Sequence, residues 1–570
     1  MALKTDDGGL LSAQPSGLHS GALIGDGEGA STLGSYGTTP TAGAYLYVAQ
    51  AQAPLTASGG NVAALMAGSK WTSLDGATAK TIVTYSFADP LTSTFAYTDD
   101  DFQSTLSTFS AADRQLTRDL LAHIEAVCNV QFVEVADNAV ECGVLRYGYS
   151  EQPNAMDFAG YAFFPAPGAI GGDIWIGANQ ADAQWDFYRP DLILHETLHA
   201  LGLKHPFSSG AVLPTDQDII ANTVMSYSTV AGSTGGYMSQ YPGQPMSLDI
   251  AALQYLYGAS TLNAGSTSYD LAGADFQGGF HAVWDAGGTD TFDASQIGRG
   301  VVLDLNEGAS SNVGVTVSAN GSVDGTAVRT DYTATLSIAA GVVIENAVGS
   351  GFDDTLIGNT AANRLDGGAG NDSLAGRDGN DVLVGGPGHN FLDGGVGVDT
   401  AAYGSSRASY TIVKTAAGVS VSSAAGTDSL VGIERLSFSD GHLALDLGGA
   451  AGTVAKVIGA VFGADCVHNA QYVGIGLHLL DAGMTGQDLV GMALDCRLGA
   501  DPSNDAVVDL LYSNLFGSAP AAAQKDAFVA LLDLGALSQE SLGQIAADHA
   551  LNAANIDLVG LSAAGVAYLA

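Results

Sequence analysis

Three histidines between Pro190 and His205 stand at a spacing that suits metal chemistry. The stretch reads PDLILHETLHALGLKH. A helix there places His195 and His199 one turn apart on one face, because four residues approximate the 3.6-residue repeat. Gly202 can take a positive φ, which lets the chain leave the helix and bring His205 back. The pattern therefore predicts one metal ion held by three imidazoles.

Glu196, beside the first histidine, completes this chemistry. Three neutral imidazoles hold Zn²⁺ and leave a position open for water, whose pKa the metal lowers to about 7. Glu196 is not a ligand, so we expect it to act as general base on that water and then to protonate the leaving amine of a peptide. On the opposite helix face lie Leu194, Leu198 and Leu201, which we expect to pack the helix against the hydrophobic core. The alternative is that these residues occur by chance in an ordinary amphipathic helix. Three His, one Glu and one Gly at fixed spacing make that alternative improbable.

A second motif, Val224-Met225-Ser226-Tyr227, follows about twenty residues after His205. With the histidine pattern it resembles the metzincin peptidases, in which a methionine turn lies beneath the zinc. HETLHALGLKHP, which includes Pro206, and VMSY resemble in particular the serralysins, secreted zinc endopeptidases with calcium-binding RTX repeats. The resemblance implies that Tyr227 is a further zinc ligand at rest and stabilises the oxyanion when substrate binds. Ordinary core positions are the alternative for Met225 and Tyr227.

The length and composition of the chain limit the number of domains and the classes of binding partner that are expected. A chain of 570 residues is expected to form two to four domains. The formal charge of −41 disfavours nucleic acid and anionic lipid as partners, while 46% hydrophobic residues argue against disorder. The 76 glycines predict many turns or a glycine-dependent repeat.

Segments for targeting are not evident in the sequence. The amino terminus has no apolar run typical of a signal peptide, and no run of 18 strongly apolar residues predicts a membrane span. Taken alone this favours the cytoplasm. The resemblance reverses the expectation, because RTX proteins typically leave the cell through a type I exporter that reads an uncleaved C-terminal signal. We therefore predict a secreted, extracellular or cell-surface protein.

The cysteines form two local pairs, Cys128 with Cys142 and Cys466 with Cys496. Neither pair has CxxC spacing, so zinc binding by thiolates is not expected. Disulfides and free thiols both remain open, since connectivity cannot be deduced from sequence.

Residues 1–60 are rich in Gly, Ser, Thr and Ala and predict a flexible leader. Its place before the catalytic domain matches the short propeptide of serralysins, so a zymogen is expected. The leader contains no cysteine, which excludes a thiolate switch on the metal. Asp26 and His19 are the candidates for blocking it.

Residues 61–260 are the predicted metzincin protease domain. Residues 82–87 read as a strand rich in β-branched and aromatic residues, and Ser110 caps a long amphipathic helix that includes Leu120 and Ile124. The stretch Ile174–Ile176 predicts the edge strand along which an extended peptide substrate binds, with an ordinary interior strand as the alternative. Residues 247–257, ended by a glycine, predict the last helix.

A nine-residue repeat dominates residues 261–449, which are the predicted RTX domain. The first glycines of its six copies are Gly349, Gly358, Gly367, Gly376, Gly385 and Gly394. The sixth place holds Asp354, Asn363, Asp372, Asp381, Asn390 and Asp399. The eighth place holds Leu356, Leu365, Leu374, Leu383, Leu392 and Ala401. A parallel β-roll (a β-solenoid) follows, in which leucines stack inside and several structural Ca²⁺ ions bind between turns.

Each repeat makes half a coil of such a roll, so residues 18 apart should stack. A Ca²⁺ ion prefers charged oxygen from both turns, which favours Asp354 with Asp372 and Asp381 with Asp399. The irregular first repeat makes the second pair the better candidate. The glycines expected to support these sites are Gly367, Gly368, Gly370, Gly376, Gly379, Gly385, Gly388, Gly394 and Gly397.

Residues 450–570 predict a helical C-terminal domain, since apolar residues recur there at three and four spacing and the segments end on glycine. It weakly resembles a helical module of large secreted bacterial proteins. A cap on the solenoid and a docking module for a cell-surface or surface-layer partner are the two interpretations.

The sequence thus predicts a multidomain α+β protein with a metzincin domain, a parallel β-roll and an all-helical C-terminal domain. The predicted function is zinc-dependent hydrolysis of internal peptide bonds in extracellular proteins. The alternatives are an RTX structural or adhesive surface protein with weak protease activity, and an aminopeptidase. His205, at a place where an aminopeptidase would have a more distant Glu, counts against the last.

Overall fold

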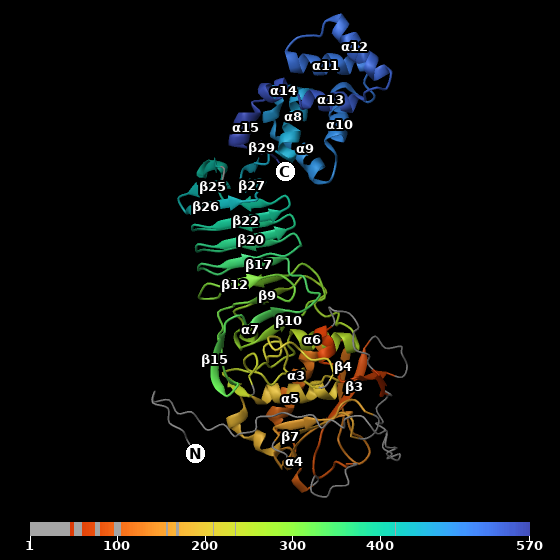
Figure 1. The fold of residues 1–570 in the computed structure, drawn as a ribbon, viewed down its shortest axis with the longest axis vertical. Coiled ribbons are helices and arrows are strands. Elements are labelled where there is room, and N and C mark those ends of the chain that lie inside the picture. Colours follow the sequence, from red (N-terminus) through yellow and green to blue (C-terminus); the bar gives the residue numbers. More distant parts are fainter. Residues whose placement is uncertain are drawn as a thin grey trace. The chain divides into compact units, whose positions relative to one another are not determined.

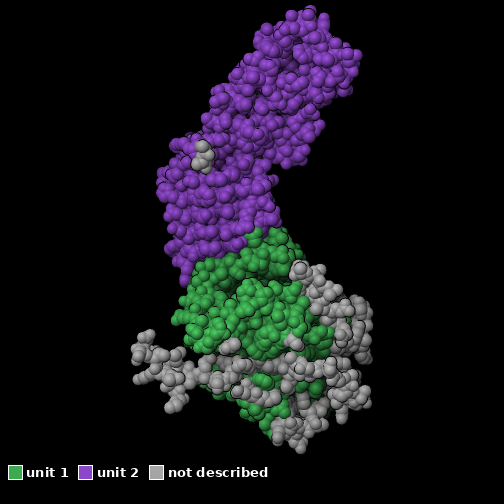
Figure 2. Space-filling view, viewed as in Figure 1, with its two compact units in different colours: residues 1–291, 306–344 green, residues 292–305, 345–570 purple. Residues whose placement is uncertain are grey.

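The computed structural model describes a chain of mixed α/β structure with a helical C-terminal region. The described residues are 46–50, 60–73, 80–95, 104–155, 158–166, 170–208, 210–233, 235–415 and 418–569. Contacts group the chain into two units, residues 1–291 with 306–344 and residues 292–305 with 345–570 (Figure 2). Asp26 and His19, the predicted blocking residues, lie outside the described residues.

A five-stranded sheet of order β4-β3-β5-β7-β6 forms the frame of the first unit; Figure 1 labels β3, β4 and β7 of this sheet. Its strands are β3 (Thr81–Phe87), β4 (Val130–Glu134), β5 (Leu145–Ser150), β6 (Gly160–Ala162) and β7 (Asp173–Gly177). All neighbours are parallel except β6, which is antiparallel to β7. The predicted strand at residues 82–87 is confirmed, and burial of its β-branched and aromatic residues explains its stability.

The edge of this sheet differs from the prediction, which placed it at Ile174–Ile176. That stretch lies in β7, which pairs with β5 on one side and β6 on the other. The chain turns back where the Phe163 N–H donates to the Asp173 carbonyl and the Gly172 N–H donates to the Phe163 carbonyl, and β6 thereby takes the edge position. The prediction of an edge strand at Ile174–Ile176 is therefore wrong, because strand order depends on this hairpin and not on local apolar pattern.

Three helices of the first unit follow the predicted boundaries closely. They are α3 (Ala111–Val127), α5 (Arg189–Ala200) and α6 (Ser247–Tyr257). The Ser110 hydroxyl accepts the Asp113 N–H at 3.1 Å and caps α3, as its sequence predicts. Gly258, with φ of 84°, ends α6. The metal-motif helix α5 packs against α3, β6 and β7, and every residue from Asp191 to Ala200 is buried.

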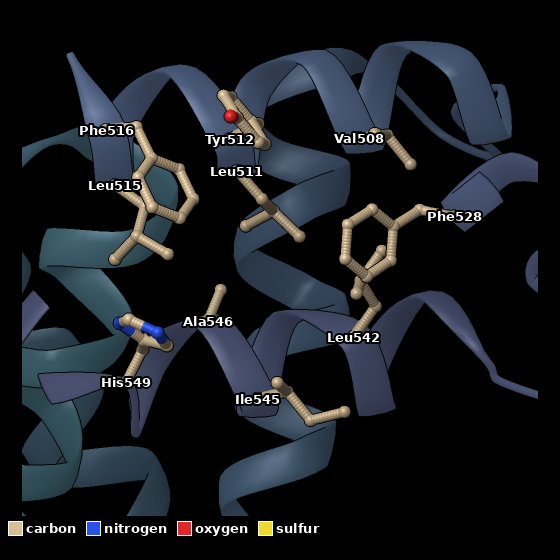
Figure 3. A pocket seen from close by; sticks show the side chains of 10 residues that line it. All are labelled: Val508, Leu511, Tyr512, Leu515, Phe516, Phe528, Leu542, Ile545, Ala546 and His549. Atoms are coloured by element: carbon tan, nitrogen blue, oxygen red, sulfur yellow. The ribbon is translucent and has the colours of Figure 1, made fainter. Parts of the chain in front are cut away.

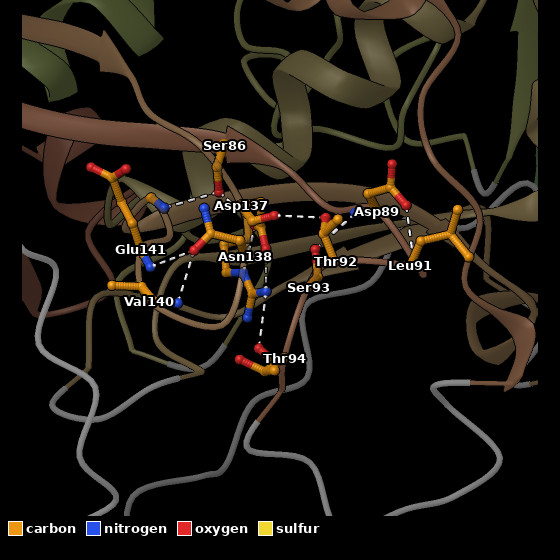
Figure 4. Close-up of polar contacts among 12 residues, drawn as sticks. Ser86, Asp89, Leu91, Thr92, Ser93, Thr94, Asp137, Asn138, Val140 and Glu141 are labelled. Carbon is orange, nitrogen blue, oxygen red and sulfur yellow. Dashed lines mark hydrogen bonds and ion pairs between the residues drawn. The ribbon is translucent and has the colours of Figure 1, made fainter.

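A buried polar network fixes the loop after β3 (Figure 4). Arg146 on β5 donates to both carboxylate oxygens of Asp137 at 2.7 and 3.0 Å, and to the Thr94 carbonyl at 3.2 Å. Asp137 also accepts the Ser86 hydroxyl at 2.7 Å. Because removal of one partner from a buried pair costs about 3–5 kcal/mol, this network stabilises the register of β3 and β5.

Short elements complete the first unit. They are β1 (Leu46–Gln50), α1 (Gly60–Ala64), β2 (Ser69–Ser73), α4 (Glu151–Ala155), β8 (Gly236–Met238), α7 (Ala274–Gln277), β10 (His281–Val283), β13 (Ser310–Ser311), β14 (Val317–Val323), β15 (Thr326–Tyr332) and β16 (Leu336–Ile338). Strand β9 (Ser268–Asp270) also belongs to this unit, whereas β11 (Thr291–Asp293) lies mainly in the second unit. β1 is antiparallel to β2, so Leu46–Gln50 is regular although the sequence pattern predicts a flexible leader there.

Two stacks of short strands, parallel except where each ends in antiparallel strands, make up the β part of the second unit (Figure 1). One contains β12 (Val302–Asp304), β18 (Thr355–Ile357), β20 (Ser373–Asp378), β22 (Phe391–Val396), β26 (Gly426–Val431), β25 (Gly418–Ser423) and β24 (Thr411–Thr415). The other also includes β11 and contains β17 (Asn346–Val348), β19 (Arg364–Asp366), β21 (Val382–Val384), β23 (Thr400–Ala402), β27 (Arg435–Phe438), β28 (Gly441–Ala444) and β29 (Val566–Tyr568).

The predicted 18-residue offset between stacked repeats is confirmed. Leu356 lies opposite Leu374, and Leu374 opposite Leu392, in parallel register. All three side chains are fully buried, so the stack has a continuous leucine core. After β22 the offset lengthens, because the β24–β25 hairpin is inserted between coils.

Helices α8–α15 follow the stacks in the second unit. Their bounds are α8 (Ala450–Phe462), α9 (Ala470–Asp481), α10 (Gly486–Leu498), α11 (Asn504–Phe516), α12 (Ala522–Asp533), α13 (Gln539–Ala547), α14 (Ala550–Asn555) and α15 (Leu558–Ala564). α8, buried on most sides, forms the centre of their common core. A cavity of about 150 Å³ lies between α11, α12 and α13 and is lined by Leu511, Phe528 and Ile545 (Figure 3).

None of the helices that the structure describes combines the length and the apolar character that a bilayer crossing requires. The four cysteines are free thiols. Cys128 is buried, which raises the pKa of its thiol to about 12.

Candidate metal centre

The structure brings His195, His199 and His205 together at the end of α5. The Nε2 atom of His205 lies 3.2 Å from that of His195 and 3.0 Å from that of His199. Gly202, with φ of 105°, makes the turn that returns His205 to the helix. A Cβ atom there would lie 2.3 Å from the Ser69 carbonyl oxygen, so this position requires glycine.

Hydrogen bonds and burial set the state of these imidazoles. His195 Nδ1 lies 2.7 Å from the Val224 carbonyl, and His199 Nδ1 lies 2.8 Å from the Leu203 carbonyl. A carbonyl only accepts, so each Nδ1 carries the proton and each Nε2 presents a lone pair. Burial lowers the pKa of His195 to about 4 and that of His205 to about 2, and it lowers the pKa of His199 as well.

Three neutral imidazoles whose free nitrogens face one point are a donor set for a borderline-soft cation such as zinc. Nitrogen lone pairs this close repel each other unless a cation lies between them. The residues present therefore fit the metal that the sequence predicts.

Glu196 is a fully buried carboxylate on the same helix. Neither of its oxygens has a hydrogen-bond partner among the residues that the structure describes. Burial raises its pKa well above the ordinary value. A Cβ atom on Gly160 of the edge strand β6 would come within 3.2 Å of Glu196 Oε1, so the carboxylate lies next to that strand.

Tyr227 closes another side of the centre. Its hydroxyl lies 2.8 Å from His205 Nε2, and its ring is 5.8 Å from that of His195. Met225 is completely buried in the preceding turn. The structure thus brings Tyr227 to the three histidines, as the predicted ligand set requires.

Asp249 on α6 is a residue that the sequence did not reveal. Its buried carboxylate accepts the Thr223 hydroxyl at 2.5 Å and the main-chain N–H groups of Val224 and Met246, both at 2.9 Å. It therefore holds the turn whose Val224 carbonyl orients His195. The prediction of α6 contained the residue but no signal for this tertiary contact.

Two phenylalanines border the histidines and were also missed. The Phe207 ring stacks on His205 with a centroid distance of 5.0 Å and an interplanar angle of 5°. Phe164, just after β6, meets His199 edge-on at 5.5 Å. Phe207 directly follows the motif in sequence, but its exposure is visible only in the structure.

The repeat carboxylates form two ladders in the second unit. Asp354 N–H donates to Asp372 Oδ1 at 2.9 Å, and Asp381 N–H donates to Asp399 Oδ1 at 2.9 Å. The Oδ2 atoms of Asp372, Asp381 and Asp399 are buried without a hydrogen-bond partner among the described residues. Burial raises the pKa of Asp372 to about 7 and that of Asp399 to about 6. These are oxygens that a hard cation would satisfy.

At the other repeats, the side-chain atoms of the sixth residue already have hydrogen-bond partners. Asp354 receives bonds from Ser350 and the Val301 N–H on both its oxygens. Asn390 accepts the Asp372 N–H through Oδ1, so its Nδ2 takes the place of the second carboxylate oxygen and donates to Asp428. Of the predicted calcium pairs, Asp381 with Asp399 is the one in which both members keep an open oxygen.

The predicted repeat glycines line these ladders. A Cβ atom on Gly376 would lie 2.2 Å from Asp381 Oδ2, and one on Gly370 (φ 140°) would lie 2.5 Å from the Phe352 carbonyl oxygen. Close backbone approach between coils therefore demands glycine. The other predicted positions with a Cβ atom blocked by the neighbouring coil or rung are Gly367, Gly368, Gly379, Gly385, Gly388, Gly394 and Gly397.

Comparison with known proteins finds one matching family and several similar relatives. Residues 257–430 match the family described as peptidase M10 serralysin C terminal. The chain is similar to serralysin G of Dickeya chrysanthemi, with 33% identity over 45% of this chain and 56% of the relative. It is also similar to serralysin of Photorhabdus laumondii, with 32% identity over 46% and 56%. A third relative, metallopeptidase AprA of Pseudomonas marginalis, is 33% identical over 42% and 52%.

The chain spans about half the length of the curated relatives it matches. The similarity supports a metalloprotease of the serralysin type at the level of the family. The helices after residue 449 lie outside residues 257–430, the region that matches the family.

Proposed function

We propose that this protein is a zinc endopeptidase that cleaves extended polypeptides. One observation carries the proposal: three neutral imidazoles share one point, and a buried carboxylate without a hydrogen-bond partner among the described residues stands beside them on the same helix. His195, His199 and His205 would hold the metal, with Tyr227 as a fourth protein ligand at rest. Bound zinc lowers the pKa of a coordinated water and polarises a carbonyl group.

The chain's own residues supply the remaining steps. The main chain of a substrate pairs with the edge strand β6, which has β7 as its partner among the described strands. Glu196 takes a proton from the attacking water and delivers it to the leaving amine. Glu196 accepts this proton only when it is ionised, so activity is lost as the pH falls through its pKa in the zinc-loaded enzyme. Tyr227 leaves His205 and donates its hydroxyl to the developing oxyanion.

The test is hydrolysis of a peptide whose N-terminus is acetylated, measured with zinc present. We expect internal cleavage, because an endopeptidase needs no free α-amino group. Removal of zinc should abolish cleavage, and readdition should restore it. Cleavage of unblocked peptides alone would favour an aminopeptidase and contradict the proposal.

Replacement of Tyr227 by phenylalanine should lower kcat by about 10²–10³ with little change in KM, because a single oxyanion donor typically contributes that much. Steady-state kinetics on the blocked peptide check this. Tyr255→Phe, which removes a hydroxyl from an exposed side chain of α6, is the control. An unchanged kcat in Tyr227→Phe would return Tyr227 to a structural role.

The wider setting of the enzyme belongs to the same proposal. The parallel stacks are a calcium-loaded β-roll, and the protein is secreted by a type I exporter as a zymogen with residues 1–60 as propeptide. The alternative function is a structural or adhesive surface protein with weak protease activity. The helices α8–α15 favour it, since they lie beyond the matched residues and offer a module for a cell-surface or surface-layer partner.

A further inference from the structure

The cavity between α11, α12 and α13 is an apolar groove that faces solvent (Figure 3). Leu511 and Leu542 are buried and form its floor. Phe516, Phe528 and Ile545 line the same space but remain exposed, with 47%, 38% and 54% of their surface accessible. Large apolar side chains gathered in one exposed hollow are typical of a surface that a partner covers.

The two ends of the groove are built differently. At one end the Phe516 ring lies 4.4 Å from that of Tyr512 and 6.1 Å from that of His549, so three rings form an aromatic corner. At the other end Phe528 comes from α12, a helix that packs against α11 and has Leu532 as its one buried residue. The helix α12 therefore acts as a wall of the groove and adds little to the core.

The length and the walls of the groove favour a helical ligand. Along α11 the lining residues extend from Val508 to Phe516, a distance of about 12 Å at 1.5 Å per residue. Apolar anchors at i, i+3 or i+4, and i+7 of a helix span about 10.5 Å, which fits that length. A helix also satisfies its own main-chain hydrogen bonds, whereas an extended peptide needs an open sheet edge that walls made of helices do not offer.

The charge of the three helices selects among such ligands. Residues 503–549 contain one Lys or Arg, Lys525, and the carboxylates Asp505, Asp509, Asp526, Asp533, Glu540 and Asp548. Lys525 pairs with Asp505 and Asp509, and Lys456 of α8 pairs with Asp548. An excess of negative charge remains on the helices that form the groove, so it attracts cationic flanks and repels a fatty-acid carboxylate or an anionic lipid.

We infer that this groove binds a short amphipathic helix of a protein partner, with large apolar residues on one face and Lys or Arg on the other. The inference rests on the proposal that α8–α15 are a module for a cell-surface or surface-layer partner, and it does not depend on zinc hydrolysis. The bound helix removes the exposed faces of Phe516, Phe528 and Ile545 from water and places its cations against the carboxylates.

The experiment follows the fluorescence anisotropy of a labelled, capped peptide titrated with the full-length protein. The protein carries Glu196→Gln, which removes the proposed base so that the probe is not consumed. The probe has about 15 residues, enough to sustain a helix, with Leu at i, i+3, i+4 and i+7 and Lys on the other face. We expect it to bind at least about tenfold more tightly than a scrambled peptide or one with Glu in place of Lys. Salt should reduce the difference from the Glu peptide.

Ile545→Ser and Phe528→Ser should each weaken binding of the Lys peptide by about tenfold or more, because each removes an apolar contact at the centre of the interface. Val559→Ser is the matched control, since Val559 is 84% exposed on α15 and lies outside the groove lining. Unchanged binding in both groove variants, or equal binding of the scrambled peptide, would overturn the inference.

Other occupants are tested with palmitate and with phosphatidylglycerol vesicles. If one of these binds in place of the peptide and Ile545→Ser abolishes that binding, the groove is a lipid site and the inference is wrong. Hydrolysis of the blocked peptide, measured with Ile545→Ser in the otherwise wild-type protein, should match the wild type. A failure of this inference therefore leaves the proposed zinc endopeptidase intact, and absence of hydrolysis with retained binding would contradict the endopeptidase alone.

Discussion

Replacing Glu196 by glutamine should lower kcat on a blocked peptide by about 10²–10⁴-fold, the usual contribution of a general acid–base residue, while zinc stays bound. Glutamine matches the shape of the buried side chain but cannot accept a proton from water. Glu196 is no part of the histidine set, so metal content measured by elemental analysis should equal that of the wild type. The separation of metal binding from activity is the signature of a base beside the metal.

Glu151→Gln provides the control, since Glu151 is an exposed carboxylate of α4 in the same unit. Its kcat should match the wild type. Full activity in Glu196→Gln would refute the proposed mechanism, and loss of zinc along with activity would make Glu196 part of the metal site. Under the adhesive alternative, the wild type itself has little activity to lose.

Calcium removal should unfold the repeat ladders of the second unit and leave the metal centre of the first intact. Without a cation, the Oδ2 atoms of Asp372, Asp381 and Asp399 are buried with no partner among the described residues, and the charge of −41 opposes compaction. All four tryptophans lie in the first unit, at positions 71, 175, 185 and 284. Far-ultraviolet circular dichroism should therefore change in calcium-depleted buffer while tryptophan fluorescence stays constant.

This instability has a defined dependence on pH. The folded state raises the pKa of Asp372 to about 7 and that of Asp399 to about 6, chiefly through burial. A raised carboxyl pKa means that the folded state prefers the protonated form, so the stability from holding these protons is lost progressively as the pH rises from 3.8, the ordinary Asp pKa, to about 6 for Asp399 and about 7 for Asp372. In calcium-depleted buffer the ladders should melt at higher temperature at pH 5 than at pH 8. Saturating calcium should remove that difference.

Asp381→Asn isolates the site, because it keeps the shape of the side chain and removes a charged oxygen. We expect calcium affinity at this rung to weaken by about tenfold or more, as judged by calorimetric titration. Asp526→Asn, which changes an exposed carboxylate of α12 outside the repeats, should titrate like the wild type. If the repeat ladders stay folded without calcium at pH 8, the proposal that calcium stabilises them is wrong.

Features set by local spacing could be predicted from the sequence. The turn of α5 places His195 and His199 together, and the glycine at position 202 is the one residue type that the return to His205 allows. The nine-residue period likewise determined the 18-residue offset of the stacks. In both cases the relevant contacts follow from backbone geometry within one or two turns of chain.

Features that depend on tertiary packing could not be predicted from the sequence. The edge position of β6 arises from a hairpin whose apolar strands look alike in sequence. Asp249 meets Val224 across 25 residues, and no periodicity links the two positions. The sequence shows that Asn390 lacks a charged oxygen, but only the hydrogen-bond ladder shows that its nitrogen takes the place of an aspartate's second oxygen.

The pairing of β28 with β29 has a topological consequence. Helices α8–α15 all lie between these two strands in the sequence, although the strands are neighbours in one sheet. The whole helical region is therefore an insertion between two paired antiparallel strands. β29 contributes only three residues, and it covers the hydrogen-bonding edge of β28. Open edges invite intermolecular strand pairing, and a very short final strand limits it. β29 therefore limits strand pairing between molecules at this edge of the sheet.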